Sequence, residues 1–270
     1  MKHFPVPMAG WLVALALFVS PPPPAIAQDE INVAVSSDFH LAMAIICRDF
    51  QRQSGVRINI SAASSGLLYA QIASGEPFDI FLSANESFPE LLEQKGLTAP
   101  GTRFTYAIGR LALFSAKKET GEINARTLSS GKFSKLALGA PSMAPYGLAG
   151  MQTLEKLGLS EKLNGRIVES GGENQAFWMV ASGGAEIGFV ALSRVTGLAG
   201  AKGSFWIVPQ RLHSPIVQQA VLMKKSDQNT QARALLEYMK TPAAQSVMKT
   251  LGYDPAPEPT AQKGPLIAIK

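Results

Sequence analysis

Three short stretches place hydroxyl-bearing residues where an expected strand leads into an expected helix. They are residues 35–39, 61–66 and 144–147. The N-terminus of a helix has unpaired backbone N–H groups and carries about half a positive charge. Small hydroxyl residues at that position leave room for an anion and add donors of their own. Three such turns aimed at one spot would bind an anion without Lys or Arg, although any one of them alone is more simply an ordinary Ser N-cap.

The elements that position these turns follow from hydrophobic periodicity, which alternates between strand and helix patterns. In the first half of the chain the pattern predicts strands at 31–35, 56–60 and 78–82 and helices at 39–53, 67–73 and 90–95. A long β-rich run at 105–115, broken by Gly109, predicts a strand that passes into a second lobe. The second half predicts strands at 136–139, 166–168, 186–191, 205–208 and 216–223 and helices at 147–157, 175–181, 231–239 and 243–250.

This order predicts an α/β protein with two lobes, each a mainly parallel sheet flanked by helices and joined to the other by two crossover strands. Lobe 1 would comprise residues 28–108 plus 216–254 and lobe 2 residues 109–215, with a Pro-rich tail at 255–270. In open α/β sheets ligands bind at the carboxyl ends of the strands. The sequence therefore predicts a hinged clamshell with its site between the lobes, closing over a ligand.

The first 27 residues are typical of an export signal. Lys2 precedes an apolar run at 11–19, and the small residues Ala25 and Ala27 form a cleavage site. Cleavage after Ala27 would release a periplasmic protein. The apolar run is short for a membrane span, so an uncleaved anchor is the less favoured alternative.

Composition narrows the remaining classes of function. The net charge is +5, without a Lys/Arg run interleaved with aromatics, so nucleic acid is not an expected partner. The only cysteine, Cys47, lies in an apolar helical pattern and is expected in the core, which leaves no internal disulfide. No His and Cys residues have metal-ligand spacing. A ligand-sensing domain of a regulator is disfavoured by the export signal and the lack of a DNA-binding segment.

Five segments, in their order and spacing, indicate a known family. They are residues 34–43, 63–72, 79–84, 144–147 and 172–193. With them the chain resembles the periplasmic molybdate-binding proteins of ABC transporters, which have the type II periplasmic binding protein fold, over residues 31–254. The resemblance implies a monomer without a cofactor and without enzymatic activity. Such a protein binds molybdate or tungstate and delivers it to an ABC permease in the inner membrane.

The resemblance also implies which residues bind the ligand. In such proteins a tetrahedral dianion takes hydrogen bonds from hydroxyls and backbone N–H groups. The matching positions are Ser37 and Asp38 in the first turn, Ser65 in the second and the backbone N–H of Tyr146 in the third. The turn at Glu173 and Asn174 would add a fourth contact. Molybdate would be held through Ser37, Ser65 and Tyr146.

Asp38 departs from this pattern, because relatives place Ser or Asn there. An ionised carboxylate about 4 Å from a unit negative charge costs on the order of 4 kcal/mol at an effective dielectric constant of 20. Asp38 could point away and cap the helix, or it could be protonated and donate, which would make binding acid-favoured. The third alternative is that the same fold binds a different small anion.

A hydrolase using Ser37 and His40 is the competing class. An enzyme needs a nucleophile with a positioned base. Ser37 and His40 leave one turn at different angles, however, and the chain has no Gly-x-Ser-x-Gly elbow. His40 is expected in solvent, Arg194 is expected at the surface or as a countercharge, and Trp178 is expected in the core.

Overall fold

The computed structural model describes residues 30–117, 123–196 and 203–257. The expected export signal at 1–27 lies outside the described residues, as do tail residues 258–270. None of the helices within the described ranges is long and apolar enough to cross a bilayer.

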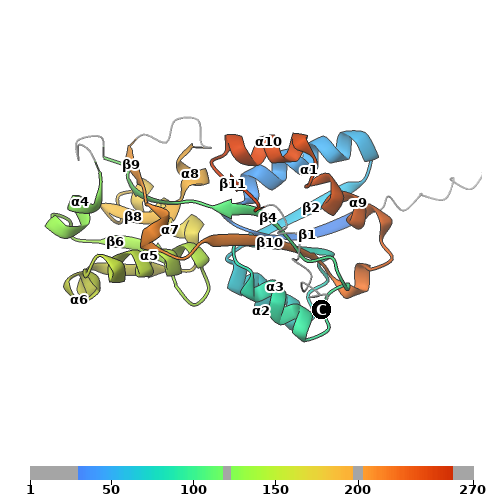
Figure 1. The fold of residues 1–270 in the computed structure, drawn as a ribbon, viewed down its shortest axis with the longest axis horizontal. Coiled ribbons are helices and arrows are strands. Elements are labelled where there is room, and N and C mark those ends of the chain that lie inside the picture. The colour runs from blue at the N-terminus through green and yellow to red at the C-terminus, as the bar shows by residue number, and fades with distance from the viewer. Residues whose placement is uncertain (1–29, 118–122, 197–202, 258–270) are drawn as a thin grey trace, which may run out of the picture.

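The first lobe is built on a six-stranded sheet with the order β11-β4-β10-β3-β1-β2. Its strands are β1 (Glu30–Ser36), β2 (Arg57–Ala63), β3 (Ile80–Ser83), β4 (Phe104–Gly109), β10 (Ile216–Leu222) and β11 (Asp254–Pro255). Its helices are α1 (His40–Ser54), α2 (Ser65–Ala73), α3 (Ser87–Gln94), α9 (Thr230–Tyr238) and α10 (Pro242–Thr250). In Figure 1, α1 and α10 lie on one side of this sheet and α2 and α3 on the other.

The second lobe is built on a five-stranded sheet with the order β7-β6-β8-β5-β9. Its strands are β5 (Leu111–Ser115), β6 (Leu136–Gly139), β7 (Ile167–Ser170), β8 (Ile187–Ala191) and β9 (Ser204–Ile207). Its helices are α4 (Ala125–Ser130), α5 (Pro145–Lys156), α6 (Ser160–Leu163), α7 (Glu173–Ala181) and α8 (Leu192–Thr196). Short 3₁₀ helices cover Asn164–Arg166 and Gln210–Leu212, and a third, Lys224–Ser226, follows β10 of the first lobe.

The chain crosses between the lobes where the sequence pattern indicated. The run at 105–115 divides into β4 and β5, which belong to different sheets and are separated only by Arg110. The chain returns through β10, which pairs antiparallel with β3 and β4 (Figure 1). Two crossovers join two lobes, as expected of a clamshell.

Parallel pairing is limited to three strands in each sheet. In the first lobe β1 is parallel to β2 and to β3, and in the second β6 is parallel to β7 and to β8. The other pairs are antiparallel, and each of them includes β4, β5 or β10, the strands next to the crossovers. Both sheets are therefore mixed, and the expectation of mainly parallel sheets was too simple.

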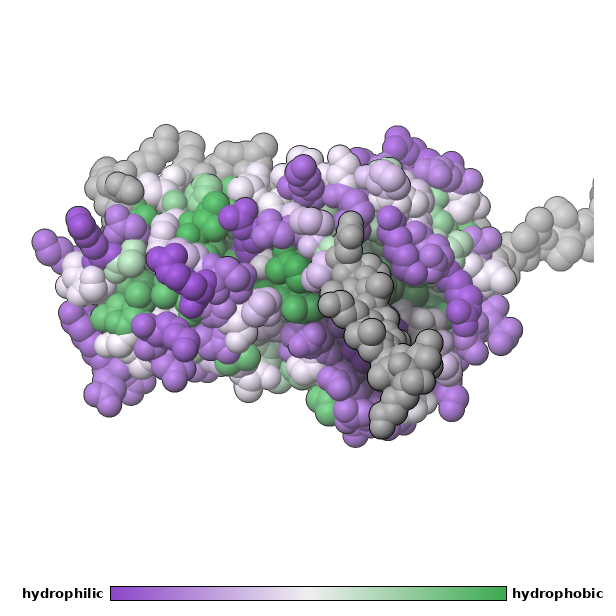
Figure 2. Space-filling view, in the orientation of Figure 1, coloured by the Kyte–Doolittle hydropathy of each residue, from purple (hydrophilic) through white to green (hydrophobic). Residues whose placement is uncertain are grey.

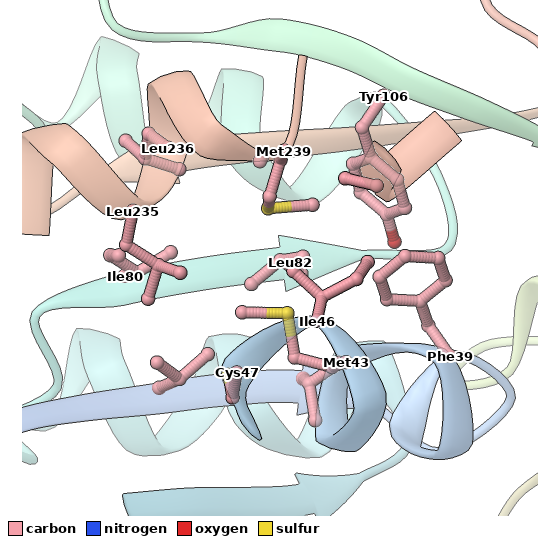
Figure 3. Packing of buried hydrophobic residues seen from close by; sticks show 14 of the residues in the cluster. Phe39, Met43, Ile46, Cys47, Ile80, Leu82, Tyr106, Leu235, Leu236 and Met239 are labelled. Carbon is pink, nitrogen blue, oxygen red and sulfur yellow. The ribbon is translucent and has the colours of Figure 1, made fainter. Parts of the chain in front are cut away.

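The first lobe's core lies against the apolar face of α1. Phe39, Met43, Ile46 and Cys47 recur at helical spacing, and Figure 3 shows them packed against residues from β3, β4 and α9. The rings of Phe39 and Tyr106 are 4.6 Å apart between centroids. Burial raises the pKa of Cys47 to about 12, so the thiol stays protonated within this core as its sequence context predicted.

Three details differ from the sequence-based expectation. Residues 125–130, where the sequence pattern predicted no helix, form α4 with a capping box at Asn124. Pro255, expected in the tail, ends β11 and pairs with Ala107. Trp178 was expected in the core, yet 55% of its surface is exposed. The surface in Figure 2 is mostly hydrophilic, with hydrophobic residues in smaller separate patches.

Gly147 allows the start of α5 to approach the end of β6. A Cβ atom at position 147 would lie 1.7 Å from the carbonyl oxygen of Gly139. No side chain fits at that distance, so glycine is required for the close approach. This contact sets the position of the third predicted anion-binding turn.

Gly147→Ala is therefore expected to lower the free energy of unfolding by about 3 kcal/mol, since overpacking forces backbone shifts. Urea unfolding monitored by circular dichroism measures this. Gly165→Ala is the matched control, because nothing lies within 4 Å of a Cβ atom there. Equal stability of the two variants would contradict the assigned role of Gly147.

Candidate anion-binding site

The turns predicted from sequence meet between the two lobes. The backbone N–H of Ser37 donates to the carbonyl of Ala63 at 2.9 Å, which joins the first turn to the second. The backbone N–H of Gly66 donates to the carbonyl of Met143 at 3.0 Å, which joins the second turn to the third. The Ser37 hydroxyl lies 3.5 Å from Oε2 of Glu173 at the start of α7. Four chain segments thus converge at one place.

Ser65 is the first residue of α2 and is fully buried. Its Oγ accepts a hydrogen bond from the backbone N–H of Ala84 at 2.9 Å, which leaves the hydroxyl proton free to donate. The neighbouring Ser64 hydroxyl is buried and has no hydrogen-bond partner among the described residues. The second turn therefore offers hydroxyl donors in a dry environment.

Tyr146 is the second residue of α5 and is fully buried. Its position in the first helical turn leaves its backbone N–H without an intrahelical partner. Its hydroxyl accepts a hydrogen bond from Nε2 of Gln218 at 3.0 Å. Burial and the nearby Asp38 carboxylate raise the pKa of Tyr146 well above its usual value, so the hydroxyl stays protonated.

Asp38 points inward and does not cap α1. Helix α1 has Phe39 at its N-cap, with no side-chain capping bond. Oδ2 of Asp38 instead accepts a hydrogen bond from Nε2 of Gln218 at 2.6 Å and lies 3.2 Å from the hydroxyl of Tyr253. The capping alternative is therefore wrong, because the Asp38 side chain makes these contacts inside the protein and no capping bond to α1.

Burial raises the pKa of Asp38, and hydrogen bonds from neighbouring side chains, including Gln218 and Tyr253, offset part of the rise. Within the described part of the chain, Oδ1 of Asp38 has no hydrogen-bond partner. Burial thus disfavours the ionised form of Asp38, whereas the hydrogen bonds to its carboxylate favour that form.

Glu173 and Asn174 lie side by side in sequence but have different surroundings. The Glu173 side chain is fully buried and faces Ser37. The Asn174 side chain accepts a hydrogen bond from Arg194, whose guanidinium also lies over the ring of Phe177 at 5.5 Å. Glu173 thus points into the site, whereas Asn174 holds Arg194.

Burial raises the pKa of Glu173 from 4.5 to about 7. The Asp38 carboxylate adds to the rise, and hydrogen bonding with the Ser37 hydroxyl and with the backbone N–H groups of Glu173 and Tyr146 offsets part of it. Glu173 therefore exchanges its proton near neutral pH. The site combines neutral donors with two buried carboxyl groups.

Sequence reasoning missed three residues of this site, which are Ser193, Gln218 and Tyr253. The hydroxyls of Ser193 and Tyr253 donate to the backbone carbonyl of Asp38 at 3.1 and 2.8 Å. Gln218 lies at a register shift in β10, and such irregularities re-aim side chains near functional sites. The one available signal was a pair of glutamines, Gln218 and Gln219, within an otherwise apolar strand.

The geometry does not favour the hydrolase alternative. His40 is exposed at the start of α1. The Ser37 hydroxyl donates to the Glu173 carboxylate rather than to an imidazole. No cluster of three or more His, Cys, Asp or Glu side chains that could hold a metal ion occurs in residues 30–117, 123–196 and 203–257.

Two mixed α/β lobes, two crossovers and a buried site at the strand ends define a periplasmic-binding-protein clamshell. The family model of the bacterial extracellular solute-binding proteins matches residues 31–254, and the chain belongs to this family. The structure of the Azotobacter vinelandii periplasmic molybdate-binding protein has the same fold. Its TM-score is 0.81 at 40% identity, covering 84% of this chain and 100% of that one.

Curated relatives agree with this assignment. The chain is 42% identical over 227 residues to the molybdate-binding protein ModA of Azotobacter vinelandii, covering 83% of this chain and 89% of that protein. It is 37% identical over 253 residues to ModA of Rhodobacter capsulatus, covering 94% of this chain and 99% of that protein. Both relatives are binding proteins.

The pKa of Glu173 predicts how stability depends on pH. Because the folded-state pKa lies above 4.5, the wild type loses stability as pH rises from about 4.5 through about 7. Glu173→Gln removes this loss. We expect the variant to be more stable than the wild type at pH 8 by on the order of 2 kcal/mol, with little advantage near pH 4.5. Urea unfolding at both pH values measures this, and an advantage that does not change with pH would contradict the assignment.

Proposed function

We propose that this protein captures a tetrahedral oxyanion, molybdate or tungstate, between its lobes and delivers it to an ABC permease in the inner membrane. The observation that supports this proposal most strongly is that turns from both lobes meet at one buried position. There the Ser37 and Ser65 hydroxyls and the backbone N–H of Tyr146 are the donors that hold the ion. The names of the relatives support the choice of molybdate.

The donor set suits an oxyanion. Hydroxyl and backbone N–H groups at helix N-termini bind oxyanions without a full countercharge. Arg194, which could have supplied one, bonds to Asn174 instead. Asp38 and Glu173 flank the ion and limit which ions enter, whereas Asn174 bonds to Arg194.

We also propose where the protein acts and that it is a monomer. The export signal is cleaved after Ala27, and the monomeric protein acts in the periplasm. It binds and releases its ligand without turnover and needs no cofactor. The periplasmic location stated for the Azotobacter vinelandii structure is consistent with this.

Isothermal titration with molybdate, tungstate, sulfate and phosphate tests the function. We expect molybdate and tungstate to bind in a 1:1 ratio. Ser65→Ala should raise the molybdate Kd by roughly 10- to 100-fold, because a hydrogen bond to a charged group contributes about 1.5–3 kcal/mol.

Ser61→Ala is the matched control, since Ser61 is exposed on the strand that leads to the same turn. Its Kd should equal that of the wild type. Absence of binding for all four ions, or equal affinities of the two variants, would contradict the proposed function.

A further inference from the structure

The Glu173 carboxyl group occupies the position where the anion-binding donors converge. Its side chain has no exposed surface, and Oε2 lies 3.5 Å from the Ser37 hydroxyl. The backbone N–H groups of Tyr146 and of Glu173 itself also interact with this carboxylate. A carboxyl group of the protein thus engages two of the three donors proposed to hold the ligand, Ser37 and Tyr146.

Each of the two buried carboxyl groups at this position has one oxygen without a hydrogen bond in the described part of the chain. Oε1 of Glu173 and Oδ1 of Asp38 are both buried, and neither has a hydrogen-bond partner among the described residues. An oxyanion presents only acceptor oxygens, and ionised carboxylate oxygens are acceptors too. A hydrogen bond between the ion and either carboxyl group therefore requires a proton on one of the two oxygens. Two acceptors in a buried site without a shared proton would repel each other.

The other charged and titratable groups nearby do not relieve this conflict. Tyr106, Tyr146 and Tyr253 all have pKa values raised well above the usual range by burial and by Asp38, so they stay neutral. Arg194 is the cation on the facing helix α8, and its guanidinium is directed to Asn174 and Phe177. Neutralisation of Glu173 therefore depends on a proton from solvent.

We propose that the oxyanion binds between the lobes together with a proton, which Glu173 takes from solvent and shares with an oxygen of the ion. The proposal rests on the proposed function. On binding, the O–H group of Glu173 becomes a donor to the ion, and on release the proton returns to solvent. Burial raises the pKa of Glu173 to about 7, so this proton is available at neutral pH.

The consequence is that the site prefers either a dianion accompanied by a protonated Glu173 or an ion that brings its own proton. Affinity for molybdate must then fall with rising pH once Glu173 ionises. For one coupled proton the fall approaches about tenfold per pH unit. A site made of neutral donors alone would show no such dependence.

The test is calorimetric titration of the wild-type protein with molybdate at about pH 6 and about pH 8.5. Each pH is measured in two non-phosphate buffers of different ionisation enthalpy. We expect the Kd to rise by at least tenfold between the two pH values. At about pH 8.5 the buffer dependence of the heat should report uptake of about one proton per ion. A Kd that does not change with pH and no proton uptake would overturn the proposal.

Two variants locate the proton. Glu173→Gln should bind molybdate with the same Kd at both pH values, within about twofold, and take up no proton. Glu169→Gln is the control, because Glu169 is exposed on β7 and should keep the wild-type pH profile. If Asp38→Asn removed the pH dependence while Glu173→Gln kept it, the assignment to Glu173 would be wrong.

The outcomes separate this proposal from the function on which it rests. Tight binding of molybdate without proton uptake leaves the proposed function intact and overturns the proton coupling alone. Absence of binding by the wild type and by Glu173→Gln at every pH overturns both. The wild-type proton count needs no variant, so a variant that failed to fold would not prevent the test.

Discussion

A buried carboxyl group at the junction of the lobes is the constraint on which the site depends. Asp38 receives hydrogen bonds from Gln218 in β10, Tyr253 beside β11 and, at its backbone carbonyl, Ser193 at the start of α8. Tyr253 also lies 3.0 Å from the Ser193 hydroxyl. Because a buried carboxyl group without such partners is costly, Gln218 and Tyr253 hold Asp38 in place within the first lobe. The Ser193 hydroxyl then joins this turn to the second lobe through the Asp38 carbonyl.

That arrangement gives the junction between the lobes its electrostatic character. Helix N-termini and hydroxyls supply positive potential and donors, while Asp38 and Glu173 supply two groups that lose their charge easily when buried. The Asp38 carboxylate disfavours ionisation of Glu173, which raises the pKa of Glu173 further. The same spot is thus suited to an anion when Glu173 is protonated and less so when it is ionised.

Much of the fold could be predicted from the sequence because it rests on local periodicity. Helix α1 and the crossover at Gly109 were found because apolar spacing and a single glycine mark them. Trp178 shows the limit of this reasoning, since a helical pattern does not reveal whether a given face is covered. The antiparallel pairs were missed for a related reason, because periodicity does not fix the direction of a neighbouring strand.

The site could be predicted only in part. The turns that contain Ser37, Ser65 and Tyr146 were predicted because each follows the end of a strand, and the resemblance to the molybdate-binding proteins singled out these three residues. The orientation of Asp38 could not be found, because it depends on Gln218 and Tyr253, which are 180 and 215 residues away in the chain. The register shift that directs Gln218 likewise has no marker in the sequence.

The most direct test of the account is a crystal structure of the protein grown with molybdate, with the metal located by its anomalous scattering. The account predicts one peak between the lobes, with oxygens of the ion within hydrogen-bond distance of the Ser37 and Ser65 hydroxyls and the backbone N–H of Tyr146. An oxygen of Glu173 should lie against an oxygen of the ion. A peak elsewhere on the protein, or a cleft without one, would contradict the account.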